Sequence, residues 1–503
     1  MDRQTERLRT FAHLAGLLEE ELPAEVFGRQ VRLVIGEDVL KTQAGQVLVL
    51  TMVRLIPRLC HRIDFVSPSS PTIRRLQPLL AAPEFSAESL AALARIIWTD
   101  GVFTAASNDA VDLVIGIGAP GDVSVGIESG AAVVLADGAA RIDDGEAVHA
   151  ALVAAPLACA QIIARLYPEI LRARVESLVR LDSGPFGGLL DAEAPRLERP
   201  FLAGVGAVGS AFIFAAIVVG ATGRILLLDP DKVKDSNLMR YVLFDNRHLD
   251  QHKVAAAKAI IQESGLDLAG ETDRVVLQDY LDAHVDERRK TEMVVSAVDT
   301  YQARREIAGW LPRRILNAGT NATDFSVSRH GFGDGYACLA CQYPAQPEEA
   351  QLDSAIAREL GLSRDEVQKL QRSKKGLTRA QLEQVATSRN VSRDQYLSYD
   401  GEPLDSFYNK EFCAKLAVPT PRGQAVAPLA HGSALAGFLL FRGISSVDTA
   451  THRHFRMDTM NGLNHPLRRS PRARGGCPLC TRRASQSLYE RRWGRQYAQQ
   501  TSA

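Results

Sequence analysis

The sequence has no excess of charge of either sign, because 59 Lys and Arg residues balance 59 Asp and Glu residues. This balance argues against a protein whose main partner is nucleic acid. Cysteines are few, and an odd number of seven in 503 residues fits reduced thiols and metal ligands better than a disulfide framework. The first residues, MDRQTERLRTFAHL, lack the apolar core of a secretory signal, so we expect a cytoplasmic protein.

Length and composition indicate an ordinary globular protein of about three domains, with 46% hydrophobic and 23% charged residues. Residues 201–223 carry no charge and are long enough to span a bilayer. Gly204, Gly206 and Gly209 near their start follow the order G-x-G-x-x-G. The strand, turn and helix of a nucleotide-binding βαβ unit are equally apolar, so we interpret the stretch as such a unit, not as a membrane span.

The first part of the chain predicts strands that alternate with helices, as in a doubly wound parallel sheet. We expect helices at about 3–21 and 148–180, and strands at 46–52, 62–67, 112–118 and 131–136.

Three short segments recur in the same order after about 160 to 180 residues, which indicates a duplicated α/β unit. RIDFVSP at 62–68 matches RILLLDP at 224–230, DLVIGIGA at 112–119 matches EMVVSAVD at 292–299, and VLADG at 134–138 matches ILNAG at 315–319.

Differences between the two copies predict that the first copy is degenerate. Opposite the glycine loop of the second copy, the first is expected to have residues 51–55, TMVRL, which contain no glycine. Ser67 stands opposite Asp229, and Ala119 stands opposite Asp299. The second copy is therefore expected to hold the nucleotide, because glycine lets a phosphate approach the backbone N–H groups at a helix start.

A set of motifs after the glycine loop resembles the adenylating domain of the ubiquitin-activating enzyme (E1-like), ThiF, MoeB and HesA superfamily. The set comprises Asp229-Pro-Asp, then Ser-Asn237-Leu-Met-Arg240, then Lys253, and Asp299 after an apolar strand. The resemblance implies that Asp229 holds the ribose of ATP and that Asn237, Arg240 and Lys253 face the triphosphate. It also implies that Asp299 holds Mg²⁺. Together, Arg240, Lys253 and Mg²⁺ would offset the charge of the α-phosphate during attack by a carboxylate.

Arg29-Gln30 resembles the R-Q segment of the same family, whose arginine reaches the ATP site of the partner half. No such segment precedes the second copy, so we predict that Arg29 is an arginine finger from the degenerate half. A surface role for Arg29 is the alternative.

The cysteines predict a zinc site and a nucleophile. Cys338-x-x-Cys341 and Cys477-x-x-Cys480 together offer the four thiolates of a structural zinc, and a redox pair is the alternative. Cys413 lies where activating enzymes of the family have their thioester-forming cysteine, and flanking Lys410 and Lys415 would favour its thiolate. The alternative for Cys413 is a buried inert thiol, which is our interpretation of the remaining two cysteines, Cys60 and Cys159.

The family resemblance implies four parts of the chain. These are an inactive adenylation domain at 1–185, an active one at 186–345, a helical insertion at 346–411 with capping boxes such as Ser363 with Glu366, and a return at 412–503 with the second zinc knuckle and an arginine-rich tail.

The implied function is ATP-dependent activation of a ubiquitin-like protein that ends in glycine, followed by thioester transfer to a conjugating (E2-like) enzyme. The plan is similar to that of bacterial activating enzymes, some of them linked to phage (antiviral) defence. No domain for recruiting a conjugating enzyme is recognisable. The alternatives are an adenylyltransferase that acts on a sulfur carrier or peptide without a thioester, and a non-enzymatic scaffold or dinucleotide-binding oxidoreductase.

Overall fold

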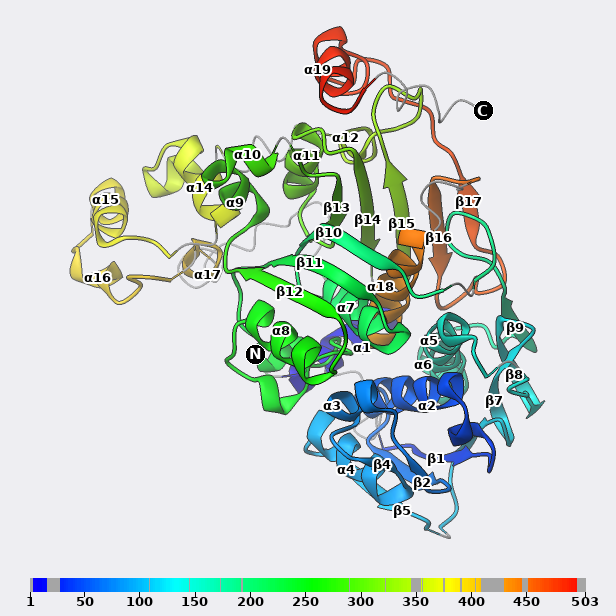
Figure 1. Ribbon diagram of the computed structural model, residues 1–503. Coiled ribbons are helices and arrows are strands. Elements are labelled where there is room, and N and C mark those ends of the chain that lie inside the picture. Colours follow the sequence, from blue (N-terminus) through cyan, green and yellow to red (C-terminus); the bar gives the residue numbers. More distant parts are fainter. Residues whose placement is uncertain are drawn as a thin grey trace.

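The chain folds around two large β-sheets, which are shown in Figure 1. The computed structural model describes residues 3–15, 28–107, 109–143, 145–171, 173–190, 193–288, 290–321, 323–344, 354, 356–373, 376–389, 391–402, 404–408, 429–445 and 451–494.

The first sheet has seven strands in the order β5-β2-β1-β6-β7-β8-β9. The strands from β5 to β7 pair in parallel, and β8 and β9 continue the sheet in antiparallel pairing. Their bounds are β1 Gln30–Ile35, β2 Arg62–Val66, β5 Val102–Ala105, β6 Leu113–Ile117, β7 Pro120–Glu128, β8 Ala131–Ala139 and β9 Leu178–Leu181, and β3 Ser70–Pro71 with β4 Glu84–Phe85 forms a separate pair.

The second sheet has eight strands in the order β12-β11-β10-β13-β14-β15-β16-β17. Pairing is parallel from β12 to β14 and antiparallel beyond it. The bounds are β10 Arg196–Ala203, β11 Thr222–Leu228, β12 Leu268–Asp273, β13 Met293–Ser296, β14 Arg314–Thr320, β15 Asp324–His330, β16 His454–Asp458 and β17 Leu467–Arg469.

Apart from β17, which has no counterpart in the first sheet, the two sheets share one strand order and one sequence of parallel and antiparallel pairs. The repeated α/β plan predicted from short sequence matches is therefore present in the topology. Two of the matched segments occupy equivalent strands, β2 with β11 and β6 with β13. The third match was wrong by one strand: 134–138 lies in β8, whereas β14 corresponds to β7. Short apolar strands resemble one another too closely to fix such a pairing.

The expected strand at 46–52 was also wrong, because these residues lie in α2, Gln43–Leu55. Thr42 caps this helix by accepting a hydrogen bond from the N–H of Gly45 at 3.0 Å. Every residue from Ala44 to Leu55 is buried, so the run is apolar all round and its periodicity does not separate strand from helix. Residues 51–55 therefore do not correspond to the glycine loop; that position belongs to the segment from Gly36 onward, directly after β1.

Four helices fill the space between the two sheets and join them into one hydrophobic core. They are α2, α5 Val148–Leu166, α7 Ala207–Val219 and α18 Ala430–Ser445. Among the described residues, α5 is the helix long and apolar enough to cross a membrane, but 94% of its most apolar window is buried inside the protein. Residues 201–223 form the end of β10, a turn, α7 and the start of β11, as the βαβ interpretation predicted.

The remaining helices lie around these layers. The described residues between 356 and 408 form short helices with a small apolar core of their own, and Figure 1 shows these helices projecting from the main body. Ser363 and Glu366 form the predicted capping box, since each backbone N–H donates to the other's side chain. The bounds are α1 Arg3–Ala15, α3 Gln77–Leu80, α4 Ala87–Ile97, α6 Pro168–Leu171, α8 Lys253–Glu263, α9 Leu277–Ala283, α10 Val285–Arg288, α11 Tyr301–Gly309, α12 Leu339–Gln342, α14 Arg364–Ser373, α15 Arg379–Arg389, α16 Asp394–Leu397, α17 Leu404–Tyr408 and α19 Arg483–Trp493.

Candidate nucleotide site and cysteine cluster

The glycine loop connects β10 to α7, and its three glycines have different surroundings. Gly204 has a φ of +91°, and a Cβ there would lie 2.7 Å from the carbonyl oxygen of Ala297 at the end of β13. A Cβ on Gly209 would lie 2.0 Å from the carbonyl oxygen of Gly204. A Cβ on Gly206, the N-cap of α7, would meet nothing within 4 Å. The loop is thus tightly packed at its two ends and open at the helix start, where a phosphate could reach the backbone N–H groups.

Asp229 follows β11 and holds the glycine loop through hydrogen bonds. Its buried carboxylate accepts hydrogen bonds of 2.8 Å from the backbone N–H groups of Val205 and Asp231. The carboxylate is therefore held directly beside the glycine loop, where the family resemblance expects a ribose ligand.

Lys253, the first residue of α8, is buried against the same acids. Its Nζ lies 3.0 Å from Asp231 Oδ2 and 3.4 Å from Asp229 Oδ1. Burial disfavours the ammonium, but Tyr241, Asp229 and Asp231 outweigh this effect and raise the pKa of Lys253. The structure therefore brings Lys253 to the loop as a permanent cation, with its charge turned toward carboxylates.

The other predicted site residues follow β11 and β13 in the chain. Asn237 ends a short 3₁₀ helix, Asp235–Asn237, and its Oδ1 accepts from the N–H of Lys234 at 3.3 Å. Arg240 is half-buried, with its guanidinium carbon 6.0 Å from the ring centre of Tyr241. Asp299 is exposed, three residues beyond β13 and two beyond Ala297, which packs against Gly204.

The structure gives Arg29 a partner within the first half. Its guanidinium lies 3.1 Å from Asp112 Oδ1, and both residues lie just before strands of the first sheet, β1 and β6. Another arginine of the N-terminal segment reaches the second half. Arg3 of α1 donates to Asp235 from its backbone N–H at 2.8 Å and from Nε at 2.9 Å. Asp235 is two residues before Asn237, so Arg3 contacts the candidate nucleotide segment directly.

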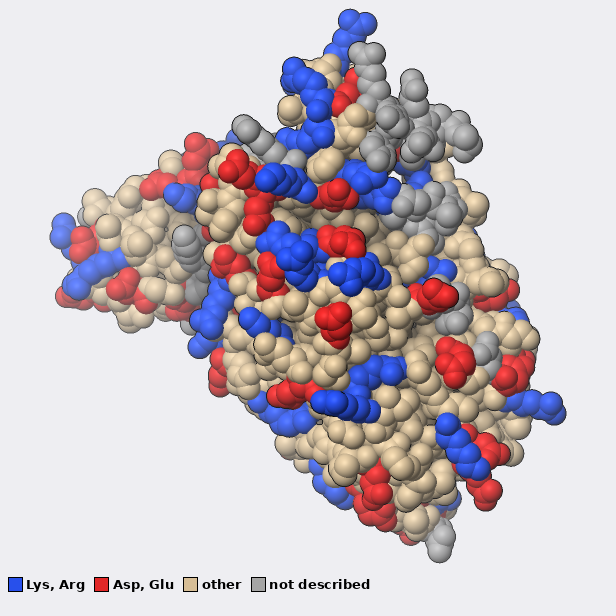
Figure 2. Space-filling view, in the orientation of Figure 1, with Lys and Arg blue, Asp and Glu red and all other residues tan. Residues whose placement is uncertain are grey.

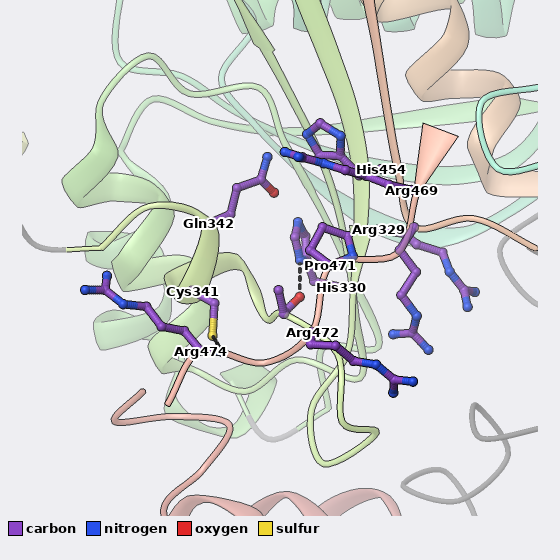
Figure 3. Close-up of a pocket in the computed structure, with 11 residues that line it drawn as sticks. Arg329, His330, Cys341, Gln342, His454, Arg469, Pro471, Arg472 and Arg474 are labelled. Carbon is purple, nitrogen blue, oxygen red and sulfur yellow. Dashed lines mark hydrogen bonds between the residues drawn. The ribbon is translucent and has the colours of Figure 1, made fainter. Parts of the chain in front are cut away.

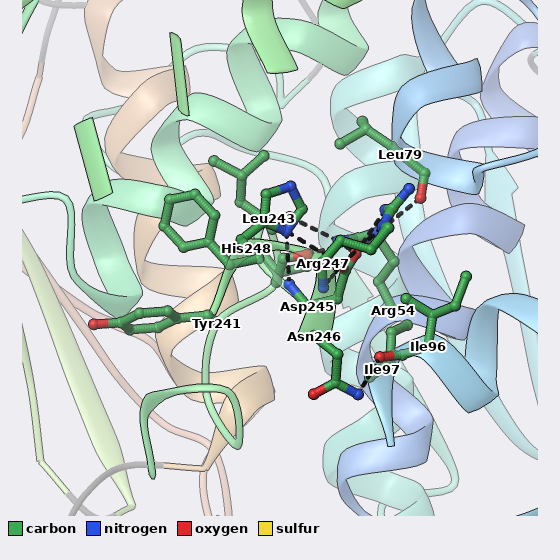
Figure 4. Close-up of polar contacts among 12 residues, drawn as sticks. Arg54, Leu79, Ile96, Ile97, Tyr241, Leu243, Asp245, Asn246, Arg247 and His248 are labelled. Atoms are coloured by element: carbon green, nitrogen blue, oxygen red, sulfur yellow. Dashed lines mark hydrogen bonds and ion pairs between the residues drawn. The ribbon is translucent and has the colours of Figure 1, made fainter. Parts of the chain in front are cut away.

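Two buried arginines of the first half hold the segment on both sides of Arg240. Arg54, in α2, donates to the carbonyl oxygens of Val242 and Leu243 and forms an ion pair of 3.0 Å with Asp245 (Figure 4). Arg58 donates to the carbonyl oxygens of Leu238 at 2.7 Å and Phe244 at 3.0 Å, and also to that of Tyr241. The first half therefore fixes the backbone of residues 238–245 in the second half.

Burial and neighbouring opposite charges shift the pKa values of Arg54, Arg58 and Asp245 in opposite directions. Burial lowers the pKa of Arg54 to about 10 and lowers that of Arg58 well below its ordinary value. Burial would raise the pKa of Asp245, but Arg247, His248 and Arg54 outweigh it and lower that pKa. No motif in the sequence pointed to these residues. Two arginines four residues apart in an apolar run were the available signal, because a buried charge needs partners.

The four predicted zinc ligands come together from segments that lie far apart in the sequence. The sulfur atoms of Cys338, Cys341, Cys477 and Cys480 all lie within 4.8 Å of one another, with contacts of 3.7 Å between Cys338 and Cys477 and 3.2 Å between Cys341 and Cys480. A tetrahedral zinc with Zn–S bonds of about 2.3 Å needs sulfur atoms about 3.8 Å apart. The cluster thus has the donor type, donor number and dimensions of a structural zinc site.

One neighbouring group supports thiolate character in this cluster. The backbone N–H of Arg474 donates to the sulfur of Cys341 at 3.3 Å. Such outer contacts orient metal ligands and favour their deprotonated form.

The remaining cysteines divide as predicted where the structure describes them. Cys60 and Cys159 are fully buried, and burial raises the pKa of Cys60 to about 12 and also raises that of Cys159. Cys413, together with Lys410 and Lys415, lies outside the described residues.

Comparison with known proteins identifies the family. The ThiF family matches residues 188–463, which contain the glycine loop and all the predicted nucleotide ligands. The chain belongs to the ThiF family, whose members are adenylyltransferases. The first sheet lies outside the matched residues.

One curated relative and several solved structures are similar. The uncharacterized protein y4jF of Sinorhizobium fredii is 30% identical over 313 residues, which cover 59% of this chain and 59% of that protein. The chain thus spans less than two thirds of the length of the relative it matches. Crystal structures of E. coli MccB are more distant. The structure with succinimide is 16% identical with a TM-score of 0.35, over 57% of this chain and 66% of that chain. The structure with MccA-N7isoASN is 14% identical with a TM-score of 0.33, over 56% of this chain and 67% of that chain.

Proposed function

We propose that the chain adenylates the carboxyl terminus of a small ubiquitin-like protein that ends in glycine. The observation that carries the proposal is the open space at Gly206, at the start of α7, beside the buried carboxylate of Asp229. Membership of the ThiF family supports an adenylyl transfer at this loop. In the reaction, a carboxylate oxygen attacks the α-phosphorus of ATP, the bond to the β-phosphate oxygen breaks, and pyrophosphate leaves.

The residues around the loop would have distinct roles in this reaction. Asp229 would bind the ribose, and Asn237, Arg240 and Lys253 would face the phosphates. In the structure the Nζ of Lys253 lies 3.0 Å from the carboxylate of Asp231. Lys253 would therefore turn away from Asp231 to reach the nucleotide. Asp299 offers an exposed carboxylate at the same edge, which suits Mg²⁺ because that ion prefers oxygen ligands. Bound Mg²⁺ would offset phosphate charge.

A thioester on Cys413 is the second proposed step. The Cys413 thiolate would attack the carbonyl carbon of the acyl-adenylate, the bond to the phosphate oxygen would break, and AMP would leave. An E2-like conjugating enzyme would then receive the acyl group. The alternative is an adenylyltransferase for a sulfur carrier or a peptide, in which Cys413 forms no thioester.

The first half, residues 1–185, would then be a degenerate adenylation domain. The active domain at 186–345, the helical insertion at 346–411 and the return of the adenylation domain at 412–503 would follow it. After β1 the first half has Gly36 and then Glu37 and Asp38, where the second half has its glycine loop. Two carboxylates would repel a phosphate at this position. The buried contacts of Arg54 and Arg58 supply a structural reason to keep the half that lacks the loop.

The decisive experiment measures ATP–pyrophosphate exchange and then the thioester. With the carrier protein added, the purified chain should exchange labelled pyrophosphate into ATP, and Asp299→Ala should abolish this exchange. A band that joins the chain and its carrier and disappears with reducing agent should be present in the wild type. It should be absent in Cys413→Ala, which keeps exchange. Exchange without such a band would favour the alternative, and no exchange would refute adenylation.

Arg29 has its own test. As a finger to the second half it should support exchange, so Arg29→Ala should lower the rate by about tenfold or more, the scale expected when a charge-stabilising donor is removed. Unchanged exchange would limit Arg29 to its ion pair with Asp112.

A further inference from the structure

A cationic cavity lies beside the cysteine cluster, away from the glycine loop. It has a volume of about 230 Å³, and its lining includes Arg329, Arg453, Arg469, Arg472, Arg474 and His454. Figure 3 shows His454 and Arg469 at one end of the cavity and Cys341 and Arg474 at the other. Figure 2 shows Lys and Arg gathered at the α19 end of the visible face.

The cavity and the glycine loop belong to opposite edges of the second sheet. The loop follows β10 at the carboxyl ends of the parallel strands. His330 ends β15, which runs antiparallel, and its backbone pairs with Ile315 near the start of β14. His330 therefore marks the amino edge of the sheet, and the cavity that it lines is separate from the candidate nucleotide site.

The positive charge in the cavity exceeds the negative charge of its described neighbours. Asp334 pairs with Arg453. Four thiolates around one divalent zinc would add two negative charges, which still leaves an excess of arginine. Within the described ranges, no ion pair joins Arg469, Arg472 or Arg474 to an acidic side chain, and all three are exposed. Because the whole chain has zero net charge, this local excess is a specific feature and not a consequence of composition.

A buried polar atom provides a second, independent observation. His454 is 5% exposed and lines the cavity, and its Nδ1 has no hydrogen-bond partner among the residues that the structure describes. Burial lowers the pKa of His454 to about 4, so the ring is neutral at pH 7 and can donate one N–H. A buried polar atom without a partner is costly, and an oxyanion in the cavity would satisfy it.

We propose that this cavity binds an oligophosphate group. A carboxylate has one charge and two oxygens, which a single arginine can satisfy through paired hydrogen bonds. Five arginines around one cavity offer far more donors, and these match a ligand with several charged oxygens. The volume is below the roughly 300 Å³ at which pockets for larger organic ligands begin, and this favours a compact ion.

Titration calorimetry with tripolyphosphate, in magnesium-free buffer without chelator, tests the proposal. The full chain should bind the ion, and Arg469→Ala and Arg472→Ala should each weaken the affinity by about tenfold, the loss expected for hydrogen bonds to a charged group. Arg472→Lys should fall between, because lysine keeps the charge and loses the paired geometry. The matched control is Arg483→Ala, an exposed arginine of α19 outside the cavity lining, and its affinity should stay within about twofold of the wild type.

Further measurements separate the possible outcomes. Unchanged affinity in both Arg469→Ala and Arg472→Ala would place the binding elsewhere and overturn the proposal. Tighter binding of a hexaglutamate peptide than of tripolyphosphate would also overturn it, in favour of an acidic protein segment. Zinc content and melting temperature equal to the wild type would show that each variant is folded. If the wild type binds tripolyphosphate but shows no ATP–pyrophosphate exchange, the proposed function is refuted and the proposal for this cavity stands.

Discussion

Arg54 of the first half and Asp245 of the second form an ion pair of 3.0 Å, and both side chains are fully buried. Asp245 also accepts from Arg247, whose side chain is 37% exposed. The buried pair lies at the end of the segment that begins with Asn237 and Arg240. This ion pair, together with the hydrogen bonds of Arg58 to the same segment, therefore couples the stability of the first half to the shape of the candidate nucleotide segment.

Arg54→Met should destabilise the protein strongly, because it leaves Asp245 buried with less compensation and three carbonyl oxygens without this donor. The expected loss is about 3 kcal/mol or more, measured as a decrease in the free energy of unfolding or in melting temperature. Arg247→Met is the matched control and should cost about 1 kcal/mol or less, since this arginine contacts the same carboxylate from a partly exposed position. Equal losses would contradict the dominant role of the buried pair.

Two glycine variants, Gly206→Ala and Gly209→Ala, distinguish a glycine that leaves room for the nucleotide from one that is required for packing of the loop. The Gly206 variant should keep its melting temperature, because a Cβ there meets nothing within 4 Å and the φ of −75° suits alanine. It should nevertheless weaken ATP binding by about tenfold or more, since the methyl group would fill the position of a phosphate. Gly209→Ala should lower stability as well, because its Cβ would lie 2.0 Å from the Gly204 carbonyl oxygen. Unchanged ATP binding in Gly206→Ala would place the nucleotide elsewhere.

The sequence was sufficient to predict the features that depend on the local spacing of residues. The glycine loop predicted the turn between β10 and α7, and two Cys-x-x-Cys pairs predicted one cluster although long segments separate them. A four-thiolate site can be predicted in this way because its chemistry demands four ligands, whatever the distance along the chain.

Long-range packing was not predictable in the same way. Residues 46–52 are apolar on every face, so the sequence does not show that they form a helix between two sheets. The partners of Arg54 and Arg58 are mostly backbone carbonyl oxygens of the other half, and a carbonyl group leaves no mark in the sequence. Only the unusual presence of charge in an apolar run indicated that some partner must exist.

Removal of one zinc ligand should unfold the region around the cluster. Cys477→Ser should reduce bound zinc from one per chain to a small fraction, measured by metal analysis, and should lower the melting temperature. Cys413→Ser is the control and should retain zinc, because the four cluster thiols do not include it. Full zinc content in Cys477→Ser, or loss of zinc in Cys413→Ser, would contradict the assignment.

Acid should destabilise the protein through buried histidines, and His431 in α18 tests this directly. The ring is 1% exposed, neither of its nitrogens has a hydrogen-bond partner in the described part of the chain, and burial lowers its pKa from 6.5 to about 4. Between these two values the unfolded state binds a proton that the folded state excludes, so stability is complete above pH 6.5 and is lost as the pH falls toward 4. From pH 7 to pH 5 the wild type should lose about 2 kcal/mol more than His431→Leu, which has no such proton to bind. Melting curves of both proteins, with the exposed His465→Leu as control, measure the difference, and parallel pH profiles for His431→Leu and the wild type would refute it.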